Sequence, residues 1–190
     1  MEYYPALLDL RGKLCCVIGG GAVACRKVRS LLDAGASVTV IAPRLSKPLG
    51  SLARSGAVAF RRGAYRSRYI RRAFLVIAAT SDAVVNRSVS KDARRFRILS
   101  NIVDQPALSS FIVPAVLSRN GLIIAVSTSG KAPALSKRIK EDLRSSVLAK
   151  YSAALRNCAR ERARLTKDRI GFNARKKILG RMAREELGRR

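Results

Sequence analysis

The chain has 190 residues, of which 48% are hydrophobic and 27% charged, so its composition excludes a disordered chain and fits one or two folded domains. Lysine and arginine number 39 against 12 aspartate and glutamate, and the formal net charge of +27 points to a polyanionic partner. Histidine is absent, which removes the commonest general base and metal ligand. Acid–base chemistry therefore falls to Asp, Glu, Cys, Tyr or Lys.

The same composition predicts a cytoplasmic protein without a membrane partner. No apolar run approaches the roughly 18 residues of a membrane helix. The first residues lack the basic and apolar segments of a secretory signal. The four cysteines form no C-x-x-C pair, and we expect the adjacent Cys15 and Cys16 to be apolar filler in a buried strand of a protein in a reducing compartment.

The chain begins with a predicted strand, helix and strand. Residues 13–18 are a short apolar run typical of a buried parallel strand. Residues 23–34 have helical periodicity, and Gly35 is expected to close that helix. Residues 37–41 are β-branched and predict a second strand, which Pro43 ends.

This alternation continues through about residue 103. Residues 58–60 are a weaker strand, and residues 74–78 are another buried one. Asp82 begins a polar helix that runs to about Arg95, and residues 97–103 predict a fifth strand. Strands that alternate with helices predict an α/β domain with a parallel sheet and right-handed crossovers.

The pattern changes after this domain. Residues 111–117 and 122–127 are apolar runs that flank Asn120-Gly121, which is a strong hairpin signal. A small antiparallel unit therefore follows the parallel sheet, and from Pro133 the chain reads as helix to its end. The basic residues are spread over the whole chain, and their densest cluster is read as a solvated basic face. It consists of Arg61, Arg62, Arg66, Arg68, Arg71 and Arg72.

Three glycines lie between the first predicted strand and helix, where they can bind a dinucleotide. Gly19 permits the tight turn, Gly21 lets the backbone approach a pyrophosphate, and Ala24 lets the helix pack close to the sheet. We expect the amides of Ala22 and Val23 to lie nearest the cofactor, because the start of a helix offers free N–H groups to phosphates. The alternative is a turn that merely needs glycine.

The end of the second strand lacks the acidic residue that usually holds the ribose hydroxyls. Pro43 and Arg44 stand there instead and are candidate cofactor-binding residues. Arg44 could contact a 2′-phosphate, which would favour NADP, or it could point into solvent. NAD is the predicted cofactor, with NADP as the alternative.

Several motifs, in this order, make residues 1–150 resemble the precorrin-2 dehydrogenases and the matching N-terminal part of sirohaem synthases. The motifs are Tyr4-Pro5 with Leu8-Asp9-Leu10, then GGGAVACRK at 19–27, AGASVTVIAP at 34–43, IAATSDAVVN at 77–86, NIVDQPALSSFIVPA at 101–115 and VSTSGKAPAL at 126–135.

The resemblance implies the NAD-dependent oxidation of precorrin-2 to sirohydrochlorin, and some members of the family also insert iron or cobalt into the product. It implies a Rossmann dinucleotide-binding domain at 1–112, a dimerisation region at 113–150 and a basic helical region at 151–190, in an intertwined homodimer. Precorrin-2 carries eight carboxylates, so a basic cleft would attract it.

Asp104 is the candidate catalytic residue. It follows the end of a predicted strand, where ligands bind in open parallel sheets, and it matches the aspartate of the family's N-x-V-D-x-P motif. Dehydrogenation releases a proton as well as a hydride, and without histidine a carboxylate is the natural base. The alternative is a turn or helix cap before Pro106.

Two further polar residues are candidate substrate contacts. Asn101 could orient the loop or the substrate. Thr128 lies in a polar loop that enters a helix, where it could instead be a simple N-cap. The family commonly has glycine where Ser129 stands, which puts the anion-binding geometry of this loop in doubt.

The competing function is a Rossmann-type nucleotide-sensing or nucleic-acid-binding module without catalysis. The basic C-terminal helices would suit nucleic acid. Aromatic residues are only 5%, however, and no nucleic-acid motif appears, so a nucleic-acid partner is not favoured. No cluster of histidine or cysteine has the spacing of a metal site, and no metal ligands are predicted.

Overall fold

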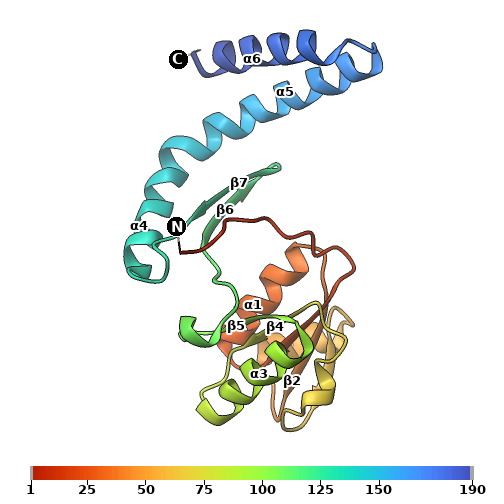
Figure 1. Cartoon of the computed structure of the whole chain (residues 1–190), viewed down its shortest axis with the longest axis vertical. Coiled ribbons are helices and arrows are strands. Elements are labelled where there is room, and N and C mark those ends of the chain that lie inside the picture. Colours follow the sequence, from red (N-terminus) through yellow and green to blue (C-terminus); the bar gives the residue numbers. More distant parts are fainter. Residues whose placement is uncertain (1, 189–190) are drawn as a thin grey trace. The chain divides into compact units, whose positions relative to one another are not determined.

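The computed structural model describes residues 2–188, apart from the side chains of residues 145, 146, 149 and 187. The chain divides into two compact units, Met1–Val113 and Pro114–Arg190 (Figure 1). The predicted boundary after residue 112 lies one residue before this division. The further boundary predicted after residue 150 falls inside a helix, Ala149–Lys167, and stays a prediction. Residues 189–190 of the predicted basic region lie outside the described residues.

The first unit is built on a five-stranded sheet. Its strands pair in the order β3-β2-β1-β4-β5, and every pair is parallel, as the strand–helix alternation predicts. Their bounds are β1 (Leu14–Ile18), β2 (Ser37–Ala42), β3 (Ala59–Arg62), β4 (Leu75–Ala78) and β5 (Leu99–Ile102). In register, Ile18 of β1 lies beside Ala78 of β4, which lies beside Ile102 of β5. The carboxyl ends of these three strands therefore meet at one edge.

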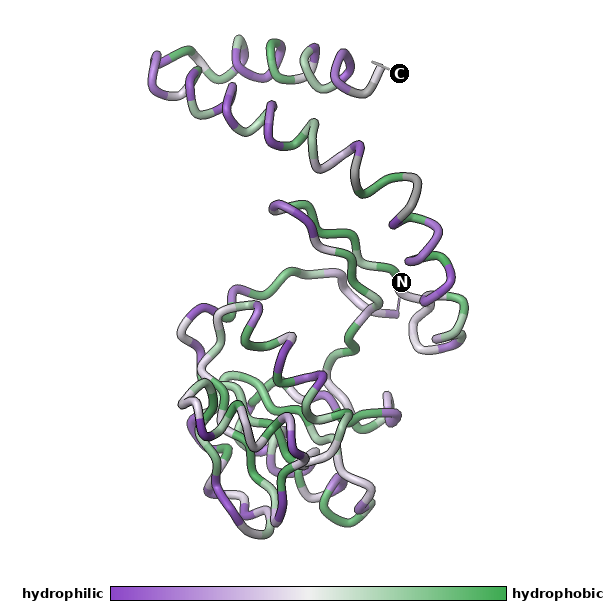
Figure 2. The backbone as a smooth tube through the Cα atoms, turned by 180° about the vertical axis from the view of Figure 1, so that it is seen from behind, coloured by the Kyte–Doolittle hydropathy of each residue, from purple (hydrophilic) through white to green (hydrophobic). Residues whose placement is uncertain are grey.

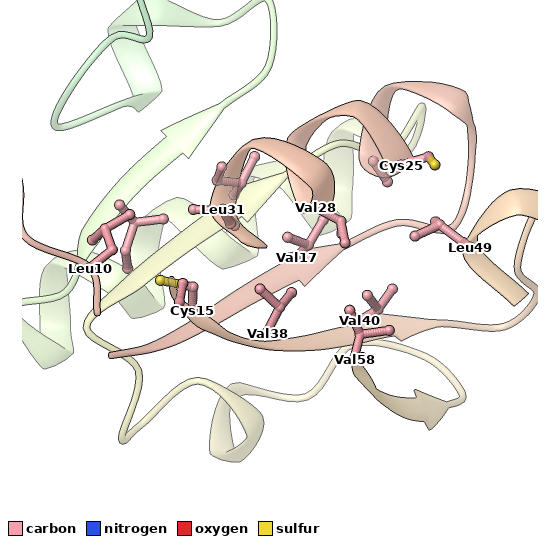
Figure 3. Packing of buried hydrophobic residues seen from close by; sticks show 14 residues of the cluster. Leu10, Cys15, Val17, Cys25, Val28, Leu31, Val38, Val40, Leu49 and Val58 are labelled. Carbon is pink, nitrogen blue, oxygen red and sulfur yellow. The ribbon is translucent and has the colours of Figure 1, made fainter. Parts of the chain in front are cut away.

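Helices α1 (Ala22–Asp33) and α2 (Lys47–Arg54) pack on one face of the sheet. Alternate strand residues such as Val17 and Val40 point at Val28 of α1 and Leu49 of α2 (Figure 3). Each of these four side chains is completely buried. Burial of one such side chain contributes about 2 kcal/mol, so this layer fixes α1 and the loop before it.

Helix α3 (Ala83–Phe96) covers the other face with Val89 and Ala93. Asp82 begins it as predicted, because its Oδ1 accepts the backbone N–H groups of Val84 at 2.8 Å and Val85 at 3.0 Å. The sequence analysis did not predict α2. That helix has eight residues with one fully buried side chain, and its proline within the first turn was the available signal.

The second unit starts with the predicted hairpin. Strands β6 (Ala115–Arg119) and β7 (Leu122–Val126) are antiparallel, and Asn120 (φ 51°) and Gly121 (φ 85°) form the turn between them. Figure 2 shows that the strands are largely hydrophobic and the tip is hydrophilic. The first strand was predicted four residues too early, because Phe111 instead packs against the core of the first unit.

From Pro133 the second unit is helical, as predicted, apart from residues 168–171. Helix α4 (Pro133–Leu143) continues through a π-helical turn, Arg144–Leu148, into α5 (Ala149–Lys167). Residues 168–171 then reverse the chain into α6 (Phe172–Gly188). No helix in the part of the chain that the structure describes is long and apolar enough to cross a membrane.

Candidate functional site

Gly19 and Gly20 bring the carboxyl ends of three strands together. Gly19 has φ of +125°, and a Cβ atom there would collide with the carbonyl oxygen of Ala79, just after β4. A Cβ atom on Gly20 would collide with the carbonyl oxygen of Arg44, just after β2. The Ser46 N–H also donates to the Gly20 carbonyl at 2.7 Å. These two glycines are needed because neighbouring backbone already fills the space around them.

Gly21 differs, because nothing lies within 4 Å of the position its Cβ would take. It is the N-cap of α1, and the first N–H of the helix to find a partner is that of Cys25, which donates to Gly21 at 3.0 Å. The preceding amides of Ala22 and Val23 lie at the exposed start of the helix. No acidic residue or side-chain cap competes for them. This open cradle, at the positive end of a helix dipole, fits a pyrophosphate.

Pro43 and Arg44 are exposed and lie beside the glycine loop, as the contact of the Arg44 carbonyl with Gly20 requires. The exposed loop after β2 therefore borders the phosphate cradle. No carboxylate stands at the end of β2 to hold the ribose hydroxyls. The role of Arg44 toward a 2′-phosphate stays a prediction.

The wall of the cradle on the β4 side was not assigned from the sequence. The methyl group of Thr80 lies 3.5 Å from the Cβ position of Gly19. The buried side chain of Asn86 holds this loop, because its amide donates to the Thr80 carbonyl at 3.2 Å and its Oδ1 accepts the Thr80 hydroxyl at 3.1 Å. The signal was present in the IAATSDAVVN motif, where Thr80 and Asn86 are six residues apart.

Asp104 lies at the same edge, two residues after β5. It is exposed and has φ of +60°, a left-handed conformation that aspartate tolerates better than most residues. The Val103 N–H ties the segment to β4 by donating to the Ala78 carbonyl at 2.9 Å. Since β1 and β5 are separated by two strand spacings, their ends are about 10 Å apart. The carboxylate is therefore within reach of a ligand that lies on the glycine loop.

Lys27 was not predicted as part of the site. It is half-buried on α1, and burial lowers the pKa of its ammonium group, as does the charge of Arg26, while the Asp104 carboxylate opposes both. Lys27 and Asp104 thus interact electrostatically. The signal available in the sequence was the lysine that ends GGGAVACRK.

Asn101 supports the loop after Asp104. It is 7% exposed, and its side-chain amide donates to the Phe111 carbonyl at 3.1 Å. The hydroxyl groups of Ser109 and Ser110 also accept backbone N–H groups of β5, at 2.9 and 2.8 Å. The returning segment is therefore fastened to the strand, and a contact of Asn101 with substrate stays a prediction.

Thr128 belongs to the second unit. Its hydroxyl accepts the Ala132 N–H at 3.0 Å and lies 3.1 Å from the Ser136 hydroxyl, so it organises the start of α4. Ser129 has φ of +55°, a left-handed conformation that glycine adopts more readily than serine. The structure places all the other candidate residues in the first unit, at the carboxyl edge of its sheet.

The parallel sheet, the glycine loop and the open start of α1 define a Rossmann-type dinucleotide-binding domain. Residues 6–115 match the family described as "Putative NAD(P)-binding", and residues 119–146 match the one described as "Sirohaem biosynthesis protein central". The first match covers more than half of the chain, which therefore belongs to this NAD(P)-binding family.

Similar proteins agree with this assignment. The chain is 40% identical over 172 residues to the siroheme synthase of Nitrosospira multiformis, covering 85% of the chain and 36% of that protein. It is 42% identical over 156 residues to the siroheme synthase of Chromobacterium violaceum, covering 82% and 33%. The chain thus spans about a third of the length of these relatives. Among solved structures, "SirC, precorrin-2 dehydrogenase" has a TM-score of 0.80 at 28% identity and covers 97% of both chains.

Proposed function

We propose that the chain oxidises precorrin-2 to sirohydrochlorin with NAD as the hydride acceptor. The observation that carries this proposal is the position of Asp104 at the same sheet edge as the phosphate cradle. The similarity of the whole chain to a precorrin-2 dehydrogenase supports the choice of substrate. The net charge of +27 suits a substrate with eight carboxylates.

The residues at this edge divide the work between binding and proton transfer. The Gly21 backbone and the amides of Ala22 and Val23 bind the pyrophosphate. A bound nicotinamide supplies the hydride acceptor. The Asp104 carboxylate takes the proton that leaves the substrate carbon, and the Lys27 ammonium keeps a positive charge beside it.

Among the aspartates of the first unit, Asp104 is best placed for this role. Asp9 is paired with Arg11, Asp82 caps α3, and Asp92 accepts the Tyr65 hydroxyl at 2.8 Å. Asp33 lies at the far end of α1. The base of the reaction is therefore expected at Asp104.

We predict that Asp104→Asn lowers kcat for precorrin-2 by at least about 100-fold, the usual contribution of a general base. The measurement is anaerobic formation of reduced cofactor, compared between NAD and NADP. The affinity for NAD should not change, and the control Asp33→Asn should keep full turnover. An Asp104→Asn enzyme with the turnover of the wild type would remove this residue from the mechanism.

We also propose that two copies associate through the hairpin. The register places Val116 beside Ala125 and Ser118 beside Ile123, on one face of the hairpin. Val116 is 46% exposed and Ile123 is 47% exposed, whereas Leu117 on the opposite face is buried. An apolar hairpin face of this kind suits a second copy of the same surface.

Finally, we propose a cytoplasmic location. All four cysteines are free, and two of them are deep in the sheet. Burial raises the pKa of Cys15 to about 11 and that of Cys16 to about 12, which keeps both thiols neutral and unreactive. These properties support a protein that folds and works in a reducing compartment.

A further inference from the structure

One end of a sheet face in the first unit has no helix over it. The chain returns from β3 to β4 through residues 63–74, whose only regular element is the short 3₁₀ turn η1 (Ser67–Tyr69). Parallel strands are usually joined by a full helix that covers the sheet. Arg61 of β3 pairs with Ile41 of β2, which belongs to the core under α3, so both lie on that face. All four residues of β3 are exposed, and this end of the face is open to solvent.

The uncovered region is hollowed and lined mainly by arginine. The hollow measures about 700 Å³, within the usual range for small-molecule sites. Its lining residues are Leu14, Arg61, Arg68, Tyr69, Arg71 and Arg72. Leu14 begins β1, five residues before Gly19, whereas Arg61 pairs with Ile41 near the end of β2. The hollow therefore extends along the face, and its Leu14 end lies about 16 Å from the glycine loop.

An aromatic ring holds two of these arginines. The guanidinium carbon of Arg61 lies 4.6 Å from the centre of the Tyr69 ring, and that of Arg68 lies 5.4 Å from it. The Tyr69 backbone is itself fixed, because its N–H donates to the Arg66 carbonyl at 3.0 Å and its carbonyl accepts the Cys16 thiol at 3.7 Å. The arginines are thus positioned before any ligand arrives.

The hollow has a positive potential that no neighbouring carboxylate neutralises. A hydrogen bond from Arg68 lowers the pKa of Tyr69, and the charges of Arg68, Arg66 and Arg61 add to the effect. None of the ion pairs found among the described residues includes an arginine of this cluster. Asp92, on the helix that covers this face, already accepts the Tyr65 hydroxyl. These exposed guanidinium groups are therefore free to pair with an anion that brings several carboxylates.

We propose that this hollow is a second binding site for the polycarboxylate tetrapyrrole, separate from the site of hydride transfer. The inference rests on the proposed function for the identity of the anion. Guanidinium groups pair with carboxylates through two parallel hydrogen bonds, and several of them converge here. Leu14 offers apolar surface to a flat macrocycle whose carboxylates lie around its rim. Each chain then binds two tetrapyrrole molecules, one at each site.

The test is to titrate the NAD-loaded protein with sirohydrochlorin and count the molecules bound per chain. We expect two for the wild type and one for the variant Arg61→Gln, Arg68→Gln, Arg71→Gln, Arg72→Gln. A control with the same loss of charge, Arg54→Gln, Arg87→Gln, Arg181→Gln, Arg184→Gln, replaces exposed arginines on three helices and should still bind two. The kcat of the first variant for precorrin-2 should match that of the wild type, which also shows that it is folded.

Binding of one molecule by the wild type, or of two by the first variant, would overturn the proposal. A different result would assign the hollow to nucleic acid. In that case a single-stranded oligonucleotide binds the wild type and the control but not the first variant, and the number of sirohydrochlorin molecules bound does not change. The count does not depend on turnover. A wild type that binds two molecules of sirohydrochlorin but does not oxidise precorrin-2 would therefore reject the proposed function and keep the second site.

Discussion

Gly20 and Gly21 are neighbours in the chain, yet they need to be glycine for different reasons. Protein backbone fills the space beside Gly20, so that position serves the packing of the β2–α2 loop on the glycine loop. The space beside Gly21 is empty, and its φ of −85° is allowed for any residue. Neither folding nor backbone conformation requires glycine there. The remaining reason for glycine at this position is the close approach of a ligand to the backbone.

This difference predicts opposite results for two alanine variants. Gly21→Ala should leave the free energy of unfolding within about 0.5 kcal/mol of the wild type but weaken NAD binding by about 10-fold or more, because the methyl group occupies the phosphate cradle. Gly20→Ala should destabilise the first unit by about 1–3 kcal/mol through overpacking. Denaturant unfolding and NAD titration measure the two effects. A Gly21→Ala protein with the NAD affinity of the wild type would show that the pyrophosphate binds elsewhere.

At the scale of elements, the helix ends of the first unit follow local rules. Asp82 caps the start of α3 as its sequence position predicts. Its other end is less favourable, since Arg97 has φ of +56°, and the Arg97 N–H donates to the Arg94 carbonyl at 3.2 Å. Glycine is the usual residue at such a position. The sequence analysis placed Arg97 in the following strand, because a left-handed arginine has no signal in the sequence.

Arg97→Gly should therefore stabilise the first unit, by about 1 kcal/mol, because it removes the strain of a left-handed side chain. The matched control is Arg87→Gly, an exposed arginine in the interior of the same helix. It should lose about 1 kcal/mol, the usual cost of glycine within a helix. Thermal and denaturant unfolding give both values. If Arg97→Gly and Arg87→Gly lowered the free energy of unfolding by the same amount, the role assigned to Arg97 would be wrong.

At the level of assembly, the proposed dimer depends on the exposed hairpin face. We predict that Ile123→Lys converts a dimer into a monomer, because it places a charge in the centre of an apolar contact. Sedimentation or light scattering measures the mass. A lysine at Ser118 cannot serve as the control, because Ser118 lies beside Ile123. The control is Arg119→Ala, at the exposed end of β6, and this variant should remain dimeric. A wild type that is monomeric at micromolar concentration would reject the hairpin contact.

Local sequence patterns are sufficient to predict the class of fold and the place of the glycine loop in it. Buried parallel strands are continuous apolar runs and amphipathic helices have a period of 3.6 residues, so the five strands, α1, α3 and the hairpin could each be predicted from local pattern. The short helix α2 could not, because eight residues with one buried side chain give too weak a period. The catalytic candidate Asp104 came from its motif, together with its place after a strand.

Local patterns do not show which residues share the edge with Asp104 or which glycine packs against backbone, because both depend on contacts between distant segments. The interaction of Lys27 with Asp104 joins residues 77 positions apart, and no local pattern encodes such a distance. The contrast between Gly20 and Gly21 depends on the backbone of Arg44, in the loop after β2. The basic hollow is lined by arginines of β3 and of the β3–β4 crossover, which lie together only in the folded chain. The period of apolar residues shows which side of each segment is buried. A binding site depends instead on which segments lie next to each other in the folded chain.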